Sequence, residues 1–222
     1  MADARRRHLR AGGALSAALA AAALLVVLLA GCGGSGDSTA ADDPFVGYWV
    51  GAGKTQMTLV QIADEGGKYV VLANPDVPVG DAGEKDGSLV VESHAVVMTF
   101  TPVSADKLML EFTGDMFKQP QGVSLKRVDE TKYADAATAY GVSVIKRGLA
   151  MWKAGGGKKY PPPKEVTPTG MLAQMIRWPN NLFVGKPMQP AESEGDYTYT
   201  LLPGGKKYSL VGHLSDGSAV GD

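Results

Sequence analysis

The sequence predicts an α+β protein, and three patterns in it support this fold class. From Phe45 to Val128, apolar and polar residues alternate with a period of two, which is typical of strands that bury one face. From Lys132 to Lys153, apolar residues recur every three or four positions, which indicates one long helix. Two short apolar runs within residues 195–212 predict a hairpin that packs against this helix.

The first 31 residues have the layout of an export signal. An arginine-rich start precedes an apolar run from Ala11 to Ala30. The end of this run and the two residues after it, Leu29-Ala30-Gly31-Cys32, resemble the lipobox of bacterial lipoproteins. This resemblance implies that residues 1–31 are a signal peptide and that the Cys32 sulfur carries a diacylglyceryl group. An uncleaved transmembrane helix is the alternative, because about 20 apolar residues can span a bilayer.

Residues 32–44 are small and polar, which predicts a flexible linker between the anchor and a folded body. Both interpretations of the N-terminus place the rest of the chain outside the cytoplasm, because the arginines stay inside. The predicted location is therefore the extracytoplasmic face of the cell membrane, and the membrane is the first predicted partner. Two or more acyl chains hold a protein stably, since each buried methylene adds about 0.8 kcal/mol.

Charge is unevenly distributed in a chain whose net charge is −1. Residues 45–130 carry 7 basic and 12 acidic side chains, whereas residues 131–222 carry 11 basic and 7 acidic ones. This asymmetry favours two domains with these bounds. Neither half has the dense Lys/Arg stripe of a nucleic-acid binder. Cys32 is the only cysteine, so no disulfide can stabilise the fold.

The first domain is expected to be an all-β meander that curls into a small barrel or a two-sheet sandwich. At about 85 residues it is expected to be too short to enclose a roomy ligand cup. The predicted strands are Gly47–Gly51, Gln56–Ala63, Lys68–Ala73, Ser88–Ser93, Ala95–Pro102, Lys107–Phe112 and Gly122–Val128, with Gly80–Gly87 as a turn.

Gly47-Tyr48-Trp49 opens the first predicted strand and resembles the Gly-x-Trp start of lipocalin-like barrels. The resemblance implies that Trp49 and Tyr48 contact a small apolar ligand, and the alternative is that Trp49 plugs the core. Nearby, Gly51-Ala52-Gly53-Lys54-Thr55 is not a phosphate-binding loop, because Tyr48 stands where that motif requires its first glycine.

The predicted helix begins after Thr131 as N-cap and ends at the glycines 155–157. Segments 151–161, 178–188 and 195–212 resemble, in order, the helix end, the Trp-Pro segment and the closing hairpin of type II secretion pseudopilins and type IV pilins. This resemblance implies a pilin-like domain of one long helix on a small antiparallel sheet. The prepilin processing site is missing, so assembly into a pilus is not expected.

Candidate chemical groups are few. His94 and His213 are the histidines that follow Cys32, and they lie in different predicted domains, so neither a zinc site nor a hydrolase site is expected. Some pseudopilins hold calcium near their C-terminus, and the resemblance makes Asp216 and Asp222 the candidates. Calcium needs six to eight oxygens, so a solvated tail is the alternative. No cofactor other than the lipid on Cys32 is expected.

Two functions remain open at this point. The first is a non-catalytic, lipid-anchored module that contacts envelope or secretion-system proteins, with the pilin resemblance suggesting type II secretion or pilus-like machinery. The second is a lipocalin-like lipoprotein that binds a small apolar ligand, as Gly47-Tyr48-Trp49 suggests. An enzyme is not expected, because no catalytic constellation is present.

Overall fold

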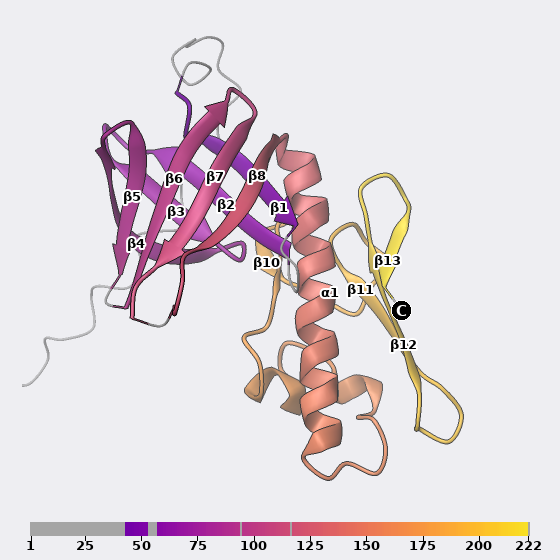
Figure 1. Ribbon diagram of the computed structural model, residues 1–222. Helices are drawn as coiled ribbons and strands as arrows, with labels where there is room; N and C mark the ends of the chain where they lie inside the picture. Colours follow the sequence, from indigo (N-terminus) through magenta and orange to yellow (C-terminus); the bar gives the residue numbers. More distant parts are fainter. Residues whose placement is uncertain (1–42, 53–56, 94, 116, 222) are drawn as a thin grey trace, which may run out of the picture. The chain divides into compact units, whose positions relative to one another are not determined.

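Eight strands form a closed barrel (Figure 1). The structure, a computed structural model, describes residues 43–221 except 53–56, 94 and 116. Each strand is antiparallel to the next, and β1 pairs with β8, so the barrel has no open edge that could recruit another chain. The strands are β1 Gly47–Ala52, β2 Met57–Asp64, β3 Tyr69–Ala73, β4 Val77–Lys85, β5 Ser88–Ser93, β6 Val96–Ser104, β7 Lys107–Thr113 and β8 Gln121–Val128.

The strand that the sequence pattern missed is β4. It covers most of the stretch from Gly80 to Gly87 that was expected to be a turn. Gly80 has a φ of 145°, and a Cβ atom there would lie 2.8 Å from the carbonyl oxygen of Glu92 on β5. The strand therefore passes its neighbour more closely than a side chain would allow, and glycine here serves a strand and not a turn.

The predicted α+β class is wrong, because the described residues are mostly β structure around a single α-helix, α1 (Glu130–Ala154). Beyond the barrel there are two small sheets and two short 3₁₀ helices. Their bounds are η1 Pro163–Glu165, η2 Met171–Gln174, β9 Asn180–Asn181, β10 Lys186–Pro187, β11 Tyr197–Leu201, β12 Tyr208–His213 and β13 Ala219–Gly221.

The pilin-like domain of a long helix on a small sheet is also wrong. The hairpin of β11 and β12 forms as expected, but the helix is shared with the barrel. Tyr133 and Ala137 in the first turns of α1 pack against Leu59, which points outward from β2. Because α1 has apolar residues on more than one face, the barrel wall covers part of it and the C-terminal segments cover the rest.

Helix α1 begins two residues earlier than predicted. Asp129 is the N-cap, and its carboxylate accepts a hydrogen bond of 2.8 Å from the backbone N–H of Lys132. Glu130 in the first turn and Lys153 in the last turn complement the helix dipole. The end was predicted correctly: Gly155 is the C-cap, and Gly156 follows with a φ of 96°.

The second half of α1 is covered by β11, β12 and the irregular segments between residues 160 and 190. Buried tyrosines in this cluster keep their hydroxyls satisfied, because Tyr197 donates to the carbonyl of Val166 and Tyr199 donates to that of Pro161. The buried members are Val142, Ile145, Leu149, Val166, Leu172, Met188, Tyr197, Tyr199 and Leu210.

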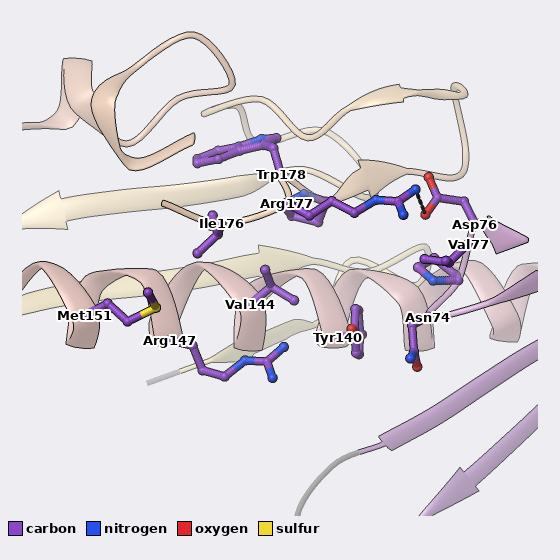
Figure 2. A pocket seen from close by; sticks show the side chains of 12 residues that line it. Asn74, Asp76, Val77, Tyr140, Val144, Arg147, Met151, Ile176, Arg177 and Trp178 are labelled. Atoms are coloured by element: carbon purple, nitrogen blue, oxygen red, sulfur yellow. Dashed lines mark hydrogen bonds and ion pairs between the residues drawn. The ribbon is translucent and has the colours of Figure 1, made fainter. Parts of the chain in front are cut away.

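The turn between β3 and β4 fastens the barrel to the C-terminal segments. Arg177 Nη2 lies 3.3 Å from Asp76 Oδ1, an ion pair that Figure 2 shows beside α1. Asn180 donates a hydrogen bond to the other oxygen of Asp76, and the Tyr133 hydroxyl donates to the Pro75 carbonyl at 3.3 Å. Three contacts therefore hold this one turn.

The predicted signal peptide, Cys32 and the linker up to residue 42 lie outside the described residues and stay predictions, as do the predicted domain boundaries. Within the described ranges, no helix combines the length and apolar character that crossing a membrane requires.

Candidate functional site

The barrel interior is built from every second residue of its strands. Along β7, Leu108 and Leu110 are buried, and Phe112 is half-buried at the end of the row. These three residues span about 14 Å, since a strand rises about 3.4 Å per residue. One row of alternate residues therefore extends from one end of the barrel to the other.

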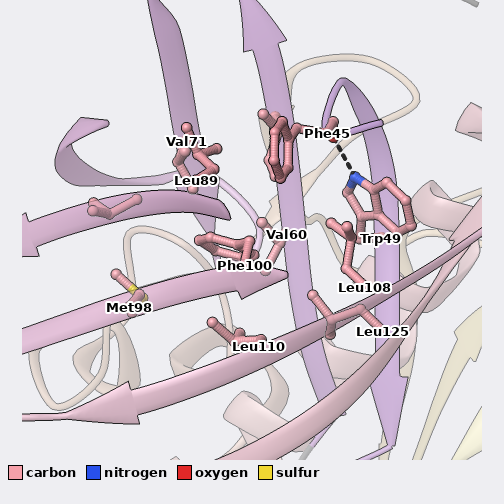
Figure 3. Packing of buried hydrophobic residues seen from close by; sticks show 12 residues of the cluster. Phe45, Trp49, Val60, Val71, Leu89, Met98, Phe100, Leu108, Leu110 and Leu125 are labelled. Carbon is pink, nitrogen blue, oxygen red and sulfur yellow. Dashed lines mark hydrogen bonds between the residues drawn. The ribbon is translucent and has the colours of Figure 1, made fainter. Parts of the chain in front are cut away.

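One end of the barrel is filled by side chains around Trp49. This indole is fully buried, and its Nε1–H donates a hydrogen bond of 2.7 Å to the carbonyl of Phe45 (Figure 3). A buried Trp contributes a large apolar area and needs a partner for its N–H, and both conditions are met here. The side chains that complete this closed end are Phe45, Ile62, Leu89, Leu108 and Leu125.

Arg127 from β8 lies across the outer side of this plug. Its guanidinium carbon is 4.6 Å from the Trp49 ring centre, and its Nη2 donates to the carbonyls of Asp43 and Pro44 at 3.2 and 3.0 Å. Arg127 Nε is buried and has no hydrogen-bond partner within the described part of the chain. The cation–π contact and the two carbonyls hold the incoming chain against the closed end.

A small polar cluster around Tyr69 lies at the outer edge of the closed end. The hydroxyl of Tyr69 lies 2.8 Å from Asp43 Oδ2 and 2.7 Å from Glu84 Oε1, and its single proton can be donated to either carboxylate. Burial, followed by these hydrogen bonds, raises the pKa of Tyr69 well above its usual range. The hydroxyl therefore stays protonated and tethers Asp43, which itself accepts from the backbone N–H of Phe45 at 2.7 Å.

The opposite end of the barrel is hollow. A cavity of about 1110 Å³ opens there, and its deep wall is made of buried side chains such as Val60, Phe100 and Leu110. Ligand pockets in proteins are usually about 300–1,000 Å³, so this cavity is slightly larger than that range. Further apolar residues that line it are Val71, Val77, Val79, Val96, Met98, Phe112, Phe117 and Val123.

The lining changes from apolar to polar toward the mouth. Thr58, Ser93 and Gln121 occupy the interior-facing register of β2, β5 and β8 and stand at the solvent end of their rows. Each offers a hydroxyl or an amide, which can both donate and accept hydrogen bonds. The described lining residues include no Asp, Glu, Lys, Arg or His. Among the described residues, the lining is thus apolar in the interior and carries uncharged hydroxyl and amide groups at the mouth.

The expectation that the barrel is too short for a roomy cup is wrong. That expectation rested on a domain length of about 85 residues. The strands expected within this length did not include β4, which widens the barrel because barrel diameter grows with strand number. Sequence reasoning also missed the lining residues. Their signal was the alternation in β6, where Val96, Met98 and Phe100 follow one another from the mouth toward the interior.

The predicted ligand contacts, Trp49 and Tyr48, lie elsewhere. Trp49 fills the closed end, in agreement with the core-plug alternative. Tyr48 faces outward and packs on α1, with its ring centre 5.0 Å from that of Tyr133. Neither residue lines the cavity, and contact of either one with a ligand stays a prediction.

The predicted calcium ligands are not brought together with other ligating groups in the part of the chain that is described. Asp216 is exposed, and its carboxylate accepts from the Ser218 N–H at 2.8 Å. Asp222 lies outside the described residues, so a metal at these two positions stays a prediction. Among the residues with assigned positions, no group of three or more His, Cys, Asp or Glu could hold a metal ion.

Of the two histidines that follow Cys32, His213 is among the described residues. His213 lies on β12, where its Nε2 is 2.8 Å from the Thr198 hydroxyl on β11, and His94 lies outside the described residues. This contact joins two neighbouring strands of the small sheet. It supplies neither a recognisable nucleophile–base pair nor a cavity.

A smaller groove of about 350 Å³ runs between α1, the β3–β4 turn and residues 176–179 (Figure 2). Val144, Ile176 and Trp178 form its apolar part, and Arg147 and Arg177 lie at its edges. Arg177 is paired with Asp76, and Arg147 also has a partner. The groove is a seam between packed segments, so the barrel cavity is the stronger candidate site.

Comparison with known proteins leaves the fold and the cavity as the basis for function. No model of a protein family matches this chain. No curated protein and no solved structure matches it either.

Proposed function

We propose that this protein binds a small apolar molecule in the open end of its barrel. The observation that supports this proposal is the cavity of about 1110 Å³, whose deep wall is apolar and whose opposite end is sealed by the Trp49 plug. Transfer of apolar surface from water into such a site is favourable by about 25 cal/mol per Å². A sealed floor and an open mouth make the barrel a cup for one ligand.

We further propose that the cup is tethered outside the cytoplasm through a lipid on Cys32. The support is the lipobox-like segment and the small, polar residues that follow it. Replacing Cys32 by serine should abolish incorporation of labelled fatty acid and leave the leader uncleaved. Unchanged fatty-acid labelling of the Cys32→Ser chain would contradict the tether and leave the barrel proposal standing.

The link to secretion or pilus-like machinery loses its support, because it rested on the pilin-like domain that the fold contradicts. A barrel that carries a ligand needs no catalytic group, so the proposed role is binding and not turnover.

The test of ligand binding uses a hexadecanol probe with a photoactivatable diazirine on its chain. The full chain, held in lipid nanodiscs, is irradiated with the probe, and the labelled peptides are identified by mass spectrometry. Labelling should concentrate on interior residues of β6 to β8 near the cavity, such as Val96, Met98 and Val123. Labelling confined to other parts of the chain would contradict the proposal.

Two neighbouring valines supply a matched control. Val96 lines the mouth of the cavity, whereas Val97 is the next residue on β6 and faces the outer surface. Val96→Trp should fill the mouth and lower labelling of the interior about tenfold, equivalent to about 1.4 kcal/mol of binding free energy. Val97→Trp adds the same side chain outside and should leave the labelling unchanged.

A further inference from the structure

We infer that the ligand of this cavity is a neutral acyl lipid, such as a long-chain alcohol or a monoacylglycerol, and not an ionised fatty acid or an alkyl cation. This inference rests on the proposed binding function and adds the chemical class of the ligand. It follows from the charges and the hydrogen-bonding groups that the barrel presents to its own interior.

The first observation is the absence of charge from the described lining. Burying an ionised carboxylate or ammonium without a partner costs several kcal/mol, whereas transfer of a methylene chain from water into the same cavity is favourable. Three charged residues of the described chain lie at the closed end, on the other side of the plug from the cavity: Arg127, and Asp43 and Glu84 beside the Tyr69 hydroxyl. An ion drawn into the cavity would find no counter-charge among the described residues that line it.

The second observation is the position of the polar groups. Thr58, Ser93 and Gln121 come from three different strands, and each stands at the mouth end of an apolar row. On β8 the row runs Gln121, Val123, Leu125, from exposed to fully buried. A molecule with one polar end and one apolar chain matches this order, with its head at the rim and its chain toward the floor.

The third observation is the chemistry of these rim groups. Hydroxyls and a carboxamide donate and accept hydrogen bonds without a net charge, which suits the hydroxyl or ester oxygen of a neutral lipid. The β7–β8 loop carries Asp115 and Lys118, but Phe117 and Pro120 are its residues that line the cavity. The described residues of the loop thus add an aromatic ring, and no charge, to the lining at the mouth. The ring centre of Phe117 is 6.1 Å from that of Phe112.

The experiment compares competitors of equal chain length against the diazirine hexadecanol probe on the full chain in nanodiscs. Hexadecanol and monopalmitoylglycerol should displace the probe from the interior peptides at concentrations at least about tenfold lower than hexadecanesulfonate or hexadecyltrimethylammonium. Equal or stronger displacement by either ion would overturn the inference while leaving ligand binding intact. Absence of any interior labelling would instead overturn the proposed function.

A gain-of-charge variant tests the head-at-rim orientation. Gln121→Lys places one cation at the mouth and should lower the concentration of hexadecanesulfonate needed for displacement about tenfold relative to that of hexadecanol. Gln119→Lys introduces the same cation two residues earlier, at an exposed position that does not line the cavity, and should change neither competitor. An unchanged sulfonate displacement in a folded Gln121→Lys chain would overturn the assigned orientation.

Discussion

The two ends of the barrel are made from the same strands but have opposite properties. At one end Phe45, Trp49 and Leu125 fill the interior, and Arg127 lies over them. At the other end the rows on β5 and β6 finish in the smaller side chains Ser93 and Val96, which line a cavity. Stability is therefore expected to reside at the closed end and binding at the open end.

The largest expected effect is the loss of the plug. Trp49→Ala should lower the free energy of unfolding by about 3–5 kcal/mol, because it leaves a large void in a fully buried site. Val96→Ala at the mouth should cost less than about 1 kcal/mol, because Val96 already borders open space.

Denaturant unfolding of both chains measures this difference. Similar losses for the two substitutions would contradict the division between the ends. Where Trp49→Ala does not fold, Trp49→Phe keeps most of the volume, loses the hydrogen bond to Phe45 and should still cost more than Val96→Ala.

The next effect concerns Arg127. Arg127→Met should lower the free energy of unfolding by about 1–3 kcal/mol, because it removes the contact with Trp49 and the hydrogen bonds to Asp43 and Pro44. Lys126→Met, one residue earlier on the outer face, should change it by less than about 0.5 kcal/mol. Thermal unfolding of the two variants gives the comparison, and equal melting temperatures would contradict a role of Arg127 in closing the barrel.

A smaller effect depends on pH. The pKa of Tyr69 is raised in the folded chain by burial and by its bonds to Glu84 and Asp43, while an unfolded tyrosine ionises near pH 10. The stability contributed by the protonated hydroxyl is complete below pH 10 and is lost as the pH rises above it, since only the unfolded chain then releases the proton. Tyr69→Phe should cost about 1 kcal/mol at pH 7 and should make the alkaline fall in stability shallower.

Urea unfolding at pH 7 and at several values above pH 10 checks this prediction. Parallel pH profiles for the Tyr69→Phe and unmodified chains would show that this hydroxyl ionises equally in both states, contrary to the expectation.

The smallest effect on stability is expected at the rim. Ser93→Ala should change the free energy of unfolding by less than about 0.5 kcal/mol, because Ser93 is exposed at the end of its strand. Calorimetry of this variant beside Trp49→Ala completes the comparison. A loss near that of the plug variant would mean that the mouth also supports the fold.

Local signals predicted much of the secondary structure. The seven expected strands are all present, and the glycines after Ala154 end α1 as predicted. The helix start was misplaced because Asp129 and Thr131 are both good N-caps, and the carboxylate of Asp129 is the group that accepts from the Lys132 N–H. Strand β4 was missed because its glycines, within the expected turn Gly80–Gly87, were taken as turn signals.

Long-range features were beyond the sequence pattern. The cavity depends on the number of strands and on their register around the barrel, and no single segment encodes either. The sequence analysis singled out the conspicuous aromatic residues Tyr48 and Trp49, whereas the described residues that line the cavity include many valines. Three segments in pilin-like order also did not specify what covers α1, because part of its cover comes from β2, some seventy residues earlier.

The attachment of the β3–β4 turn has a consequence for the shape of the mouth. Asn74 and Val77 border the cavity, and the two residues between them are tied down by Tyr133, Arg177 and Asn180. This side of the cavity mouth is therefore held in place. A ligand wider than the mouth therefore has to displace the strands on the opposite side. In this way the residues that follow the barrel limit the width of a mouth that they do not line.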